Sequence, residues 1–412
     1  MTPLKETRTL CPDCLRPLVG LSYEEGGKVY LERTCPEHGR KVALIAGDRK
    51  HYWLRDEVPH PPLSADEKCA VGPEHRSCVA LLELTDACNL ACPACYAQSP
   101  AGKHRPLPEL KEALSRFIRE RGPLDVLQLS GGEPTIHPDF LAILDFARRA
   151  PIGHVMVNTN GIELARSPTL AAELAKRKPK IELYLQMDGL DERSHSVLRG
   201  AKLLELKRKA LEQVRQHDLP TTLVCTVVQG VNDQEIGELL RLGLGMPQIR
   251  GVTLQPATSA GRFELPLDPL SRATLSEVIQ AVEAQSAGKL AASDFKPLPC
   301  SNPNCCSFTF IARPRQGPQI PLTRLIQIED HLEKIKDRIS FTVRDAEECC
   351  GVKAKPDEVF RVVVKPFMDA WTYDQDRIDE CCTHILRPDG SSVSFCQYNT
   401  LERGRSTGKD PA

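Results

Sequence analysis

Aromatic residues and long apolar runs are scarce in this chain of 412 residues. Phe, Trp and Tyr make up 5% of it, too few to form a surface on which nucleic-acid bases stack. The net charge is -1, from 54 basic and 55 acidic residues, so no overall field attracts nucleic acid. No apolar run approaches the roughly 18 residues of a membrane-spanning helix, and the first ten residues lack the apolar core of a secretory signal. We therefore expect a cytoplasmic protein that binds no nucleic acid.

Cysteine, in contrast, is abundant, with 17 residues. Most of them fall in CxxC, CxxxCxxC and CC groups, which suit metal and cluster ligation in a reducing compartment better than disulfides. The length allows a central catalytic domain of roughly 200 residues with smaller additions at each end. We expect three units: a metal-binding module at 1–60, a central domain at 75–290 and a cysteine-rich region with little regular periodicity at 291–412.

The central region alternates short apolar segments with longer amphipathic ones, which is typical of repeated β-α units. The pattern predicts an α/β domain whose parallel strands form a partial barrel of six strands. The predicted strands are 79–84, 125–129, 154–158, 181–186, 222–228 and 252–255, and the predicted helices include 108–121, 139–149, 203–217, 233–242 and 271–284.

The N-terminal module contains two short ligand pairs. Cys11 and Cys14 form a CPDC motif, and Cys35 and His38 stand in a CPEH motif after a hairpin-like stretch. Three thiolates and an imidazole at this spacing close a tetrahedral site for zinc or for a rubredoxin-like iron. A closed site of this kind indicates a structural role, and the absence of a basic stripe around it disfavours a DNA-binding zinc ribbon.

A CxxxCxxC motif formed by Cys88, Cys92 and Cys95 directly follows the first predicted strand, with Tyr96 next to it. Three cysteines bind three irons of a four-iron, four-sulfur cubane, so a fourth iron stays open for an exchangeable ligand. The alternative for this motif is a structural zinc site or a redox thiol group. We take these three cysteines as the residues on which catalysis depends.

The second predicted strand runs into Gly131, Gly132 and Glu133. Paired glycines allow the backbone to approach a ligand closely, and a carboxylate beside them can accept hydrogen bonds from an ammonium group. The later strands also end in polar residues, where function concentrates in such barrels. We expect ribose and substrate contacts from Gln186 and Asp188, then from Asn158, with further cofactor contacts from Thr226 and Gln255.

Eight more cysteines follow residue 299: Cys300, Cys305, Cys306, Cys349, Cys350, Cys381, Cys382 and Cys396. Their number suffices for two clusters with four thiolates each. The alternatives are one cluster with spare thiols, or zinc. His384 is a further candidate ligand, which would bind through its imidazole in place of a thiolate.

The cysteine motif followed by an aromatic residue, together with the GGE segment, resembles the radical S-adenosylmethionine (SAM) superfamily. The resemblance implies a [4Fe-4S] cluster on Cys88, Cys92 and Cys95, with SAM on the open iron and its amino group near Gly131, Gly132 and Glu133. It also implies reductive cleavage of SAM to a 5'-deoxyadenosyl radical that takes hydrogen from an unactivated carbon. An electron donor such as flavodoxin or ferredoxin is expected with it.

The segments CNLACPACYA, SGGEPTIHPDF, LYLQMDG, PLPCSNPNCC and ECCTHILRPDG narrow the resemblance to the archaeal tetraether-lipid synthase group and its bacterial relatives. This implies carbon-carbon bond formation on a lipid or other apolar substrate, one or two auxiliary [4Fe-4S] clusters, and transient contact with a membrane surface. The chain looks shorter than members of that group and has Ser394 where a proline is expected before Phe395. Chemistry therefore transfers more safely than substrate.

Two other functions stay open. One is radical modification, such as methylation, of a pterin-like small molecule or a peptide. The other is a non-catalytic iron-sulfur electron carrier, which leaves the GGE segment unexplained. The sequence carries no signal for the oligomeric state.

Overall fold

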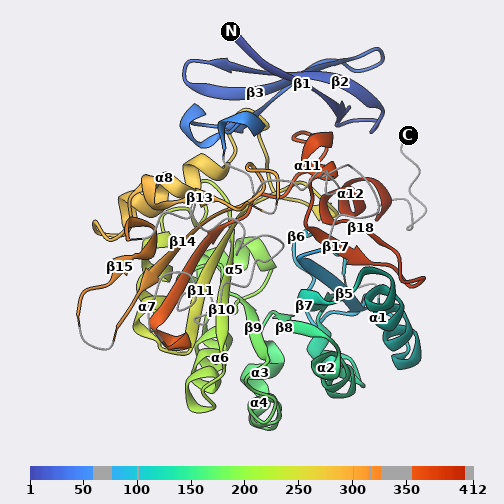
Figure 1. The fold of residues 1–412 in the computed structure, drawn as a ribbon, viewed down its shortest axis with the longest axis vertical. Helices are drawn as coiled ribbons and strands as arrows, with labels where there is room; N and C mark the ends of the chain where they lie inside the picture. Colours follow the sequence, from blue (N-terminus) through green and yellow to red (C-terminus); the bar gives the residue numbers. More distant parts are fainter. Residues whose placement is uncertain (59–76, 100–101, 300, 315–316, 326–354, 404–412) are drawn as a thin grey trace.

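The structure, a computed structural model, describes residues 1–58, 77–99, 102–299, 301–314, 317–325 and 355–403 (Figure 1). Three of the predicted ligands, Cys300, Cys349 and Cys350, lie outside the described residues. Among the described residues, no helix combines the length and the apolar character that crossing a membrane requires.

The N-terminal module is a four-stranded antiparallel sheet in the order β1-β2-β3-β4. A tight turn joins β2 to β3 through Gly26 and Gly27, whose φ values of 60° and 76° suit a hairpin turn with positive φ at both positions. In Figure 1 this sheet forms a separate layer above the rest of the molecule. Its strands are β1 (Thr2–Leu10), β2 (Pro17–Glu25), β3 (Lys28–Cys35) and β4 (Gly39–Ala46).

The central domain contains six parallel strands that are neighbours in chain order, as predicted. Side chains from all six strands line one cavity, so the sheet is curved into a partial barrel. The strands are β5 (Val79–Thr85), β7 (Leu124–Gly131), β8 (Ile152–Thr159), β9 (Ile181–Gln186), β10 (Thr221–Val227) and β11 (Ile249–Pro256).

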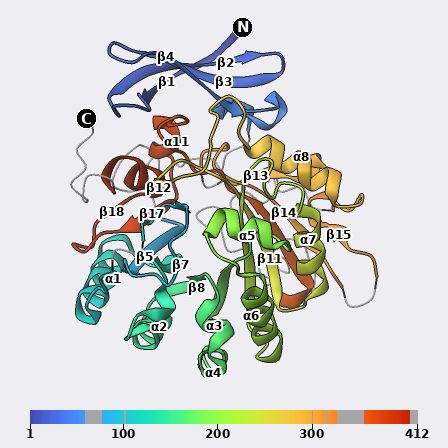
Figure 2. The same ribbon diagram turned by 180° about the vertical axis from the view of Figure 1, so that it is seen from behind.

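Helices cover the outer face of this sheet (Figure 2). In α1 the buried residues Leu110, Ala113, Leu114 and Phe117 form one apolar stripe that packs on the strands. The five predicted helices are α1 (Leu107–Arg121), α2 (Phe140–Arg149), α6 (Leu204–Gln216), α7 (Ile236–Gly245) and α8 (Leu275–Gln285). Three shorter helices were not predicted: α3 (Ile162–Arg166), α4 (Pro168–Ala175) and α5 (Glu192–Arg199).

The C-terminal region has more regular structure than its sequence predicts. Its strand β16 (Val359–Val364) pairs in parallel with β11, and β17 (Thr383–Leu386) pairs in parallel with β5. These strands therefore extend the barrel sheet at both edges. The sheet ends with the antiparallel strands β14 (Ser307–Ala312) and β18 (Ser392–Ser394) and the short β13 (Lys296–Pro297) and β15 (Ile320–Pro321).

The N-terminal sheet rests on the segment that precedes Cys381. The Thr9 hydroxyl donates to the carbonyl oxygen of Tyr373 at 2.6 Å, and Lys5 pairs with Asp374 at 2.8 Å. The remaining short elements lie near the barrel mouth: β6 (Ala94–Cys95), β12 (Arg262–Phe263), α11 (Gln375–Asp379) and α12 (Phe395–Gln397).

Candidate functional site

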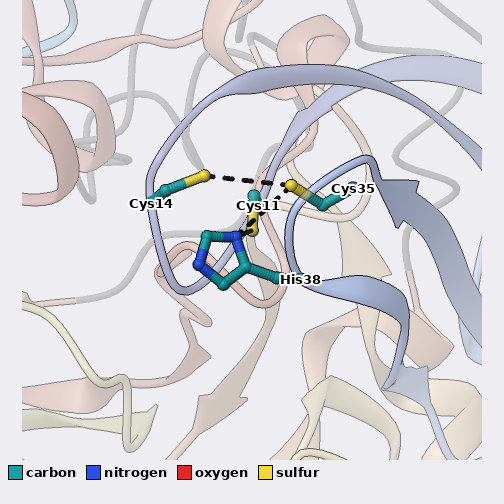
Figure 3. A group of neighbouring side chains, drawn as sticks. All are labelled: Cys11, Cys14, Cys35 and His38. Atoms are coloured by element: carbon teal, nitrogen blue, oxygen red, sulfur yellow. Dashed lines mark hydrogen bonds between the residues drawn. The ribbon is translucent and has the colours of Figure 1, made fainter. Parts of the chain in front are cut away.

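The predicted N-terminal metal site is assembled in the structure (Figure 3). One donor atom each from Cys11, Cys14, Cys35 and His38 lies within 4.8 Å of the other three. The loop after β1 supplies the first pair, and the end of β3 and the following turn supply the second. Hydrogen bonding to His38 lowers the pKa of the Cys35 thiol to about 6, which favours the thiolate that a metal binds.

The loop after β5 brings Cys88, Cys92 and Cys95 to the wall of the barrel cavity. Burial raises the pKa of the Cys88 thiol to about 12 and also raises that of Cys92. Buried thiols of this kind become thiolates when they bind a cation, because the charge of the metal offsets the loss of water.

The two glycines of the GGE segment lie directly against this loop. Gly131 has φ +117°, and a Cβ there would lie 2.3 Å from the carbonyl oxygen of Thr85. A Cβ on Gly132 would lie 2.0 Å from the carbonyl oxygen of Ala87. The amide of Gly132 donates to Thr85 at 2.7 Å, so only glycine allows the end of β7 to support the start of the cysteine loop.

Glu133 lines the cavity, but its carboxylate is engaged by the chain itself. Its oxygens accept hydrogen bonds from the hydroxyls of Thr135, at 2.5 Å, and Thr159, at 2.7 Å, and from the amide of Asn160, at 2.7 Å. The side chain is buried, which raises its pKa. Glu133 therefore ties the end of β7 to the end of β8.

Asn160 extends this connection to the cysteines. Its side-chain amide donates to the carbonyl oxygen of the Asn89 side chain at 2.7 Å and to the sulfur of Cys88 at 3.9 Å. The GGE segment thus supports one cluster ligand through Asn160, which sequence reasoning did not single out.

The other predicted strand-end residues divide into two groups. Tyr96, Asn158, Gln186, Thr226 and Gln255 line the cavity as expected, together with the GGE residues. Asp188 does not line it.

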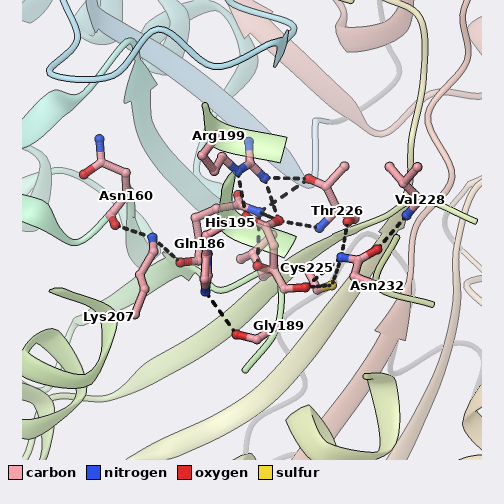
Figure 4. Close-up of polar contacts among 12 residues, drawn as sticks. Asn160, Gln186, Gly189, His195, Arg199, Lys207, Cys225, Thr226, Val228 and Asn232 are labelled. Atoms are coloured by element: carbon pink, nitrogen blue, oxygen red, sulfur yellow. Dashed lines mark hydrogen bonds and ion pairs between the residues drawn. The ribbon is translucent and has the colours of Figure 1, made fainter. Parts of the chain in front are cut away.

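The Asp188 carboxylate is fully buried and accepts hydrogen bonds at 2.6 and 2.7 Å from Arg199. Figure 4 shows Arg199 beside Thr226, to whose hydroxyl it also donates. Arg199 lines the cavity in its place. Burial raises the pKa of the Cys92 thiol, and the nearby charge of Arg199 opposes that rise. The prediction of a direct ribose contact from Asp188 therefore does not fit the described geometry, because the arginine stands between the carboxylate and the cavity.

Lys207 on α6 was also missed. Its ammonium donates to the carbonyl oxygens of Asn160 at 2.6 Å and Gln186 at 2.7 Å, so it holds the ends of β8 and β9 together. Burial lowers its pKa to about 8. A signal was available, because Lys207 occupies the buried stripe of its helix with Ala210, Leu211 and Val214.

The cavity has a volume of about 270 Å³. The side-chain oxygen of Asn158 is buried in its wall and has no hydrogen-bond partner among the described residues. An unpaired polar atom beside three thiols and a glycine cradle fits a bound cluster with a polar organic ligand, since such a ligand can supply the missing donor.

The described C-terminal cysteines gather near the barrel. The thiols of Cys305, Cys382 and Cys396 lie close enough to Cys381 to raise its pKa, after the larger effect of burial. The amide of Met368 donates to the Cys396 sulfur at 3.3 Å. Cys306 also faces Cys382 and Cys305, whereas the ring nitrogen Nδ1 of His384 is hydrogen-bonded to Ser77 at 2.9 Å.

Comparison with known proteins identifies two matching families. Residues 82–243 match the model of the radical SAM superfamily, and residues 3–47 match that of the HMPTM N-terminal zinc ribbon domain. The chain thus has the radical SAM α/β fold with an N-terminal zinc ribbon, as the sequence-based fold predicts.

Individual relatives cover different shares of the chain. A 7,8-dihydro-6-hydroxymethylpterin dimethyltransferase of Methanocaldococcus jannaschii is 29% identical over 97% of this chain and 94% of its own length. A probable GTP 3',8-cyclase of Pyrococcus abyssi is 31% identical over 39% of this chain and 51% of its own length. A solved radical SAM methyltransferase from Sphaerobacter thermophilus is 15% identical, with a TM-score of 0.39, over 70% of this chain and 75% of its own.

The family model over residues 82–243 and the two relatives found by sequence support the resemblance to the radical SAM superfamily. They do not support the narrower resemblance to the tetraether-lipid synthase group, because the relative that spans nearly the whole chain is named for a pterin.

Proposed function

Because this chain is a radical SAM enzyme that carries an N-terminal zinc ribbon, we propose that it methylates a pterin-like heterocycle. The observation that carries the proposal is the match to the pterin dimethyltransferase, which extends over 97% of the chain and includes both terminal regions. This was the alternative prediction, and it is favoured here over carbon-carbon bond formation on a lipid.

The residues around the cavity have separate tasks in this proposal. Cys88, Cys92 and Cys95 would hold the [4Fe-4S] cluster, and Gly131 and Gly132 let the end of β7 pack directly against the cysteine loop. When bound, the cluster and SAM supply a radical strong enough to take hydrogen from an unactivated carbon. Glu133, through its bonds to the end of β8, keeps the cysteine loop and the cavity wall in a fixed relation.

The cavity wall contains polar side chains that suit a heterocyclic ring. The amide of Gln255 donates to the Tyr184 hydroxyl at 3.2 Å, and the amide of Asn158 donates to Gln128 at 3.2 Å. All four side chains line the cavity. A pterin ring presents adjacent hydrogen-bond donors and acceptors at its edge, which amides and hydroxyls can match.

Carbon-carbon bond formation on a lipid remains a second candidate because most of the exposed cavity wall is apolar. Val79 and Leu81 on β5 and Val126 on β7 line it, together with Phe367 and Phe395. An apolar substrate would pack against these side chains.

We further propose that the described C-terminal thiols hold one auxiliary [4Fe-4S] cluster. Cys305, Cys381 and Cys396 supply three ligands, and Cys306 or Cys382 supplies the fourth. Replacing both Cys381 and Cys396 with alanine should lower the iron and sulfide content of the reconstituted protein by about one cluster. Cys225→Ala is the control, because that buried thiol lies inside β10 and should leave the content unchanged.

The reductant and the setting of the reaction follow from the same chemistry. We propose a flavodoxin or ferredoxin as the electron donor and a cytoplasmic location, where thiolate ligands stay reduced. Contact with a membrane surface belongs to the second candidate alone.

The two candidates are separated by one anaerobic assay. The reconstituted enzyme is supplied with dithionite and excess SAM, of which one molecule is cleaved and a second can donate the methyl group. It also receives either 7,8-dihydro-6-hydroxymethylpterin or an archaeal diether lipid. Mass spectrometry should detect 5'-deoxyadenosine and a methylated pterin. A coupled lipid without a methylated pterin would replace the first candidate with the second, and a fully loaded enzyme that forms no deoxyadenosine would overturn both.

A further inference from the structure

A charged network crosses four strands inside the barrel. Glu182 on β9 is 4% exposed and accepts hydrogen bonds from three side chains. The ring nitrogen Nε2 of His154 on β8 lies 3.1 Å from one carboxylate oxygen. The hydroxyl of Thr222 on β10 and the guanidinium of Arg361 on β16 each lie 2.5 Å from the other oxygen.

This network lies away from the cysteine loop. His154 precedes Asn158 by four residues on β8, so it lies roughly 13 Å closer to the start of that strand. Glu182 and Thr222 likewise stand near the starts of their strands. The cysteine loop, in contrast, follows the end of β5.

Arg361 reaches Glu182 across two intervening strands, because the sheet order is β9-β10-β11-β16. Its partner in register on β11 is Gly251. A Cβ at Gly251 would lie 2.9 Å from the Cβ of Arg361 and 2.5 Å from its carbonyl oxygen. A glycine at this position therefore leaves space on the inner face of β11 beside Arg361.

The network has unused hydrogen-bonding capacity on one side only. The side chains of His154 and Arg361 are 21% and 20% exposed, and both line the cavity. Nδ1 of His154 and Nε and Nη1 of Arg361 have no partner recorded among the described residues. A structural ion pair would need only the groups that meet Glu182, so these additional nitrogens are available to a ligand.

The charges define the kind of atom that this end of the cavity binds. Burial alone would raise the pKa of Glu182, but Arg361 and His154 lower it to about 2, so the carboxylate is ionised and already engaged. Because Nε2 of His154 donates to this carboxylate, Nδ1 of the neutral ring is an acceptor. The free donors of the network are therefore Nε and Nη1 of Arg361, which require an oxygen acceptor. Farther along the same wall, the unpaired oxygen of Asn158 requires a donor.

We propose that Arg361 binds an oxo group of the substrate while Asn158 accepts a hydrogen bond from a ring N-H. This inference rests on the proposed function and deepens it: a pterin carries both groups on one rigid ring. Bound in this way, the ring would lie along the inner face between the network and the cysteine loop. Arg361 then acts as a binding residue, and Glu182 acts through it as a positioning residue.

The test measures the binding of 7,8-dihydro-6-hydroxymethylpterin to the reconstituted, SAM-loaded enzyme by anaerobic calorimetry. Arg361→Lys retains the charge and the partner of Glu182 but removes the planar group that can bind two atoms at once. The Kd for the pterin should rise about tenfold or more, because a hydrogen bond from a charged donor is lost.

Arg313→Lys is the matched control. Arg313 is also a buried arginine, but it donates to the carbonyl oxygens of Gly243 and Ile249 and does not line the cavity. Its variant should retain the Kd of the unaltered enzyme for the pterin. An equal rise in both variants would overturn the inference, since it would indicate general loosening of the barrel.

The remaining outcomes separate the inference from the function on which it rests. If the unaltered enzyme binds the pterin and Arg361→Lys binds it equally well, Arg361 does not bind the oxo group, and the proposed substrate stands. If the unaltered enzyme binds no pterin, both the proposed substrate and the proposed role of Arg361 in binding it are wrong. A parallel rise in the Kd for SAM in Arg361→Lys would also overturn the inference, since the substitution would then affect the cavity as a whole.

Discussion

The Asp188 carboxylate and the Arg199 guanidinium form a buried two-pronged ion pair behind the cysteine loop, with N-O distances of 2.6 and 2.7 Å. Burial alone would raise the pKa of Asp188, but Arg199 holds it below its usual range. Burial raises the pKa of the Cys92 thiol, and the nearby charge of Arg199 opposes that rise. The pair therefore places a fixed positive charge beside one predicted cluster ligand.

Asp188→Asn should destabilise the fold strongly, because it leaves the charge of Arg199 buried without its counter-charge. We expect a loss of about 3–5 kcal/mol in the free energy of unfolding, measured by denaturant titration followed by circular dichroism. Asp218→Asn is the control, since the side chain of Asp218 is 68% exposed and pairs with Lys178 at the surface. It should change the same quantity by less than about 1 kcal/mol. Equal effects of the two substitutions would show that the buried pair contributes no more to the free energy of unfolding than the surface pair does.

Gly132→Ala should disable the cysteine loop. The new Cβ would lie 2.0 Å from the carbonyl oxygen of Ala87, so the loop must move away from the end of β7. We expect a lower iron content after reconstitution and at least a tenfold slower formation of 5'-deoxyadenosine. Gly245→Ala, at the end of α7 with no atom within 4 Å of the new Cβ, should leave both measurements unchanged. A normal iron content and rate in Gly132→Ala would contradict the close support seen between β7 and the loop.

Cys35→Ser should remove the metal of the N-terminal ribbon. Three remaining donors bind zinc or iron less tightly, and in small ribbons the binding energy is part of the folding energy. Elemental analysis should find one metal equivalent fewer, and the melting temperature should fall because β1 contacts Tyr373 and Asp374. Cys225→Ser, which replaces a buried thiol with a hydroxyl, should keep the full metal content. Retention of the ribbon metal in Cys35→Ser would rule out this residue as a ligand.

Glu182→Gln should alter how stability depends on pH. The pKa of Glu182 falls from 4.5 to about 2 in the folded state, so its stabilising effect is complete above about pH 4.5 and disappears as the pH falls toward 2. The free energy of unfolding of the unaltered protein should therefore exceed that of the variant by a few kcal/mol near neutral pH, and the difference should shrink steadily in acid. Unfolding titrations of both proteins at several pH values test this. A difference that stays constant down to about pH 3 would mean that the carboxylate is not held ionised by Arg361.

Local sequence patterns predicted the elements that carry the barrel. The strand 181–186 has the predicted bounds, because a short apolar run between polar turns is readable without knowledge of its neighbours. The helices α3 and α4, with five and eight residues, are too short for a helical period to stand out. The pairing of β16 with β11 was missed because it joins segments that are far apart in the chain.

The sequence by itself determined the ligand set of the N-terminal site. Cys11 and Cys14 stand close together in the chain, as do Cys35 and His38, so each pair presents two donor atoms at one point, and the structure brings the two pairs together. Only the tertiary structure decided which charges are buried and with which partners. Glu182 and Arg361 are 179 residues apart, and they meet because the sheet is curved and extended by a C-terminal strand. The sequence does not show whether a charged residue faces water or a buried partner. Burial strengthens the interaction of such a pair, and only the tertiary structure determines it.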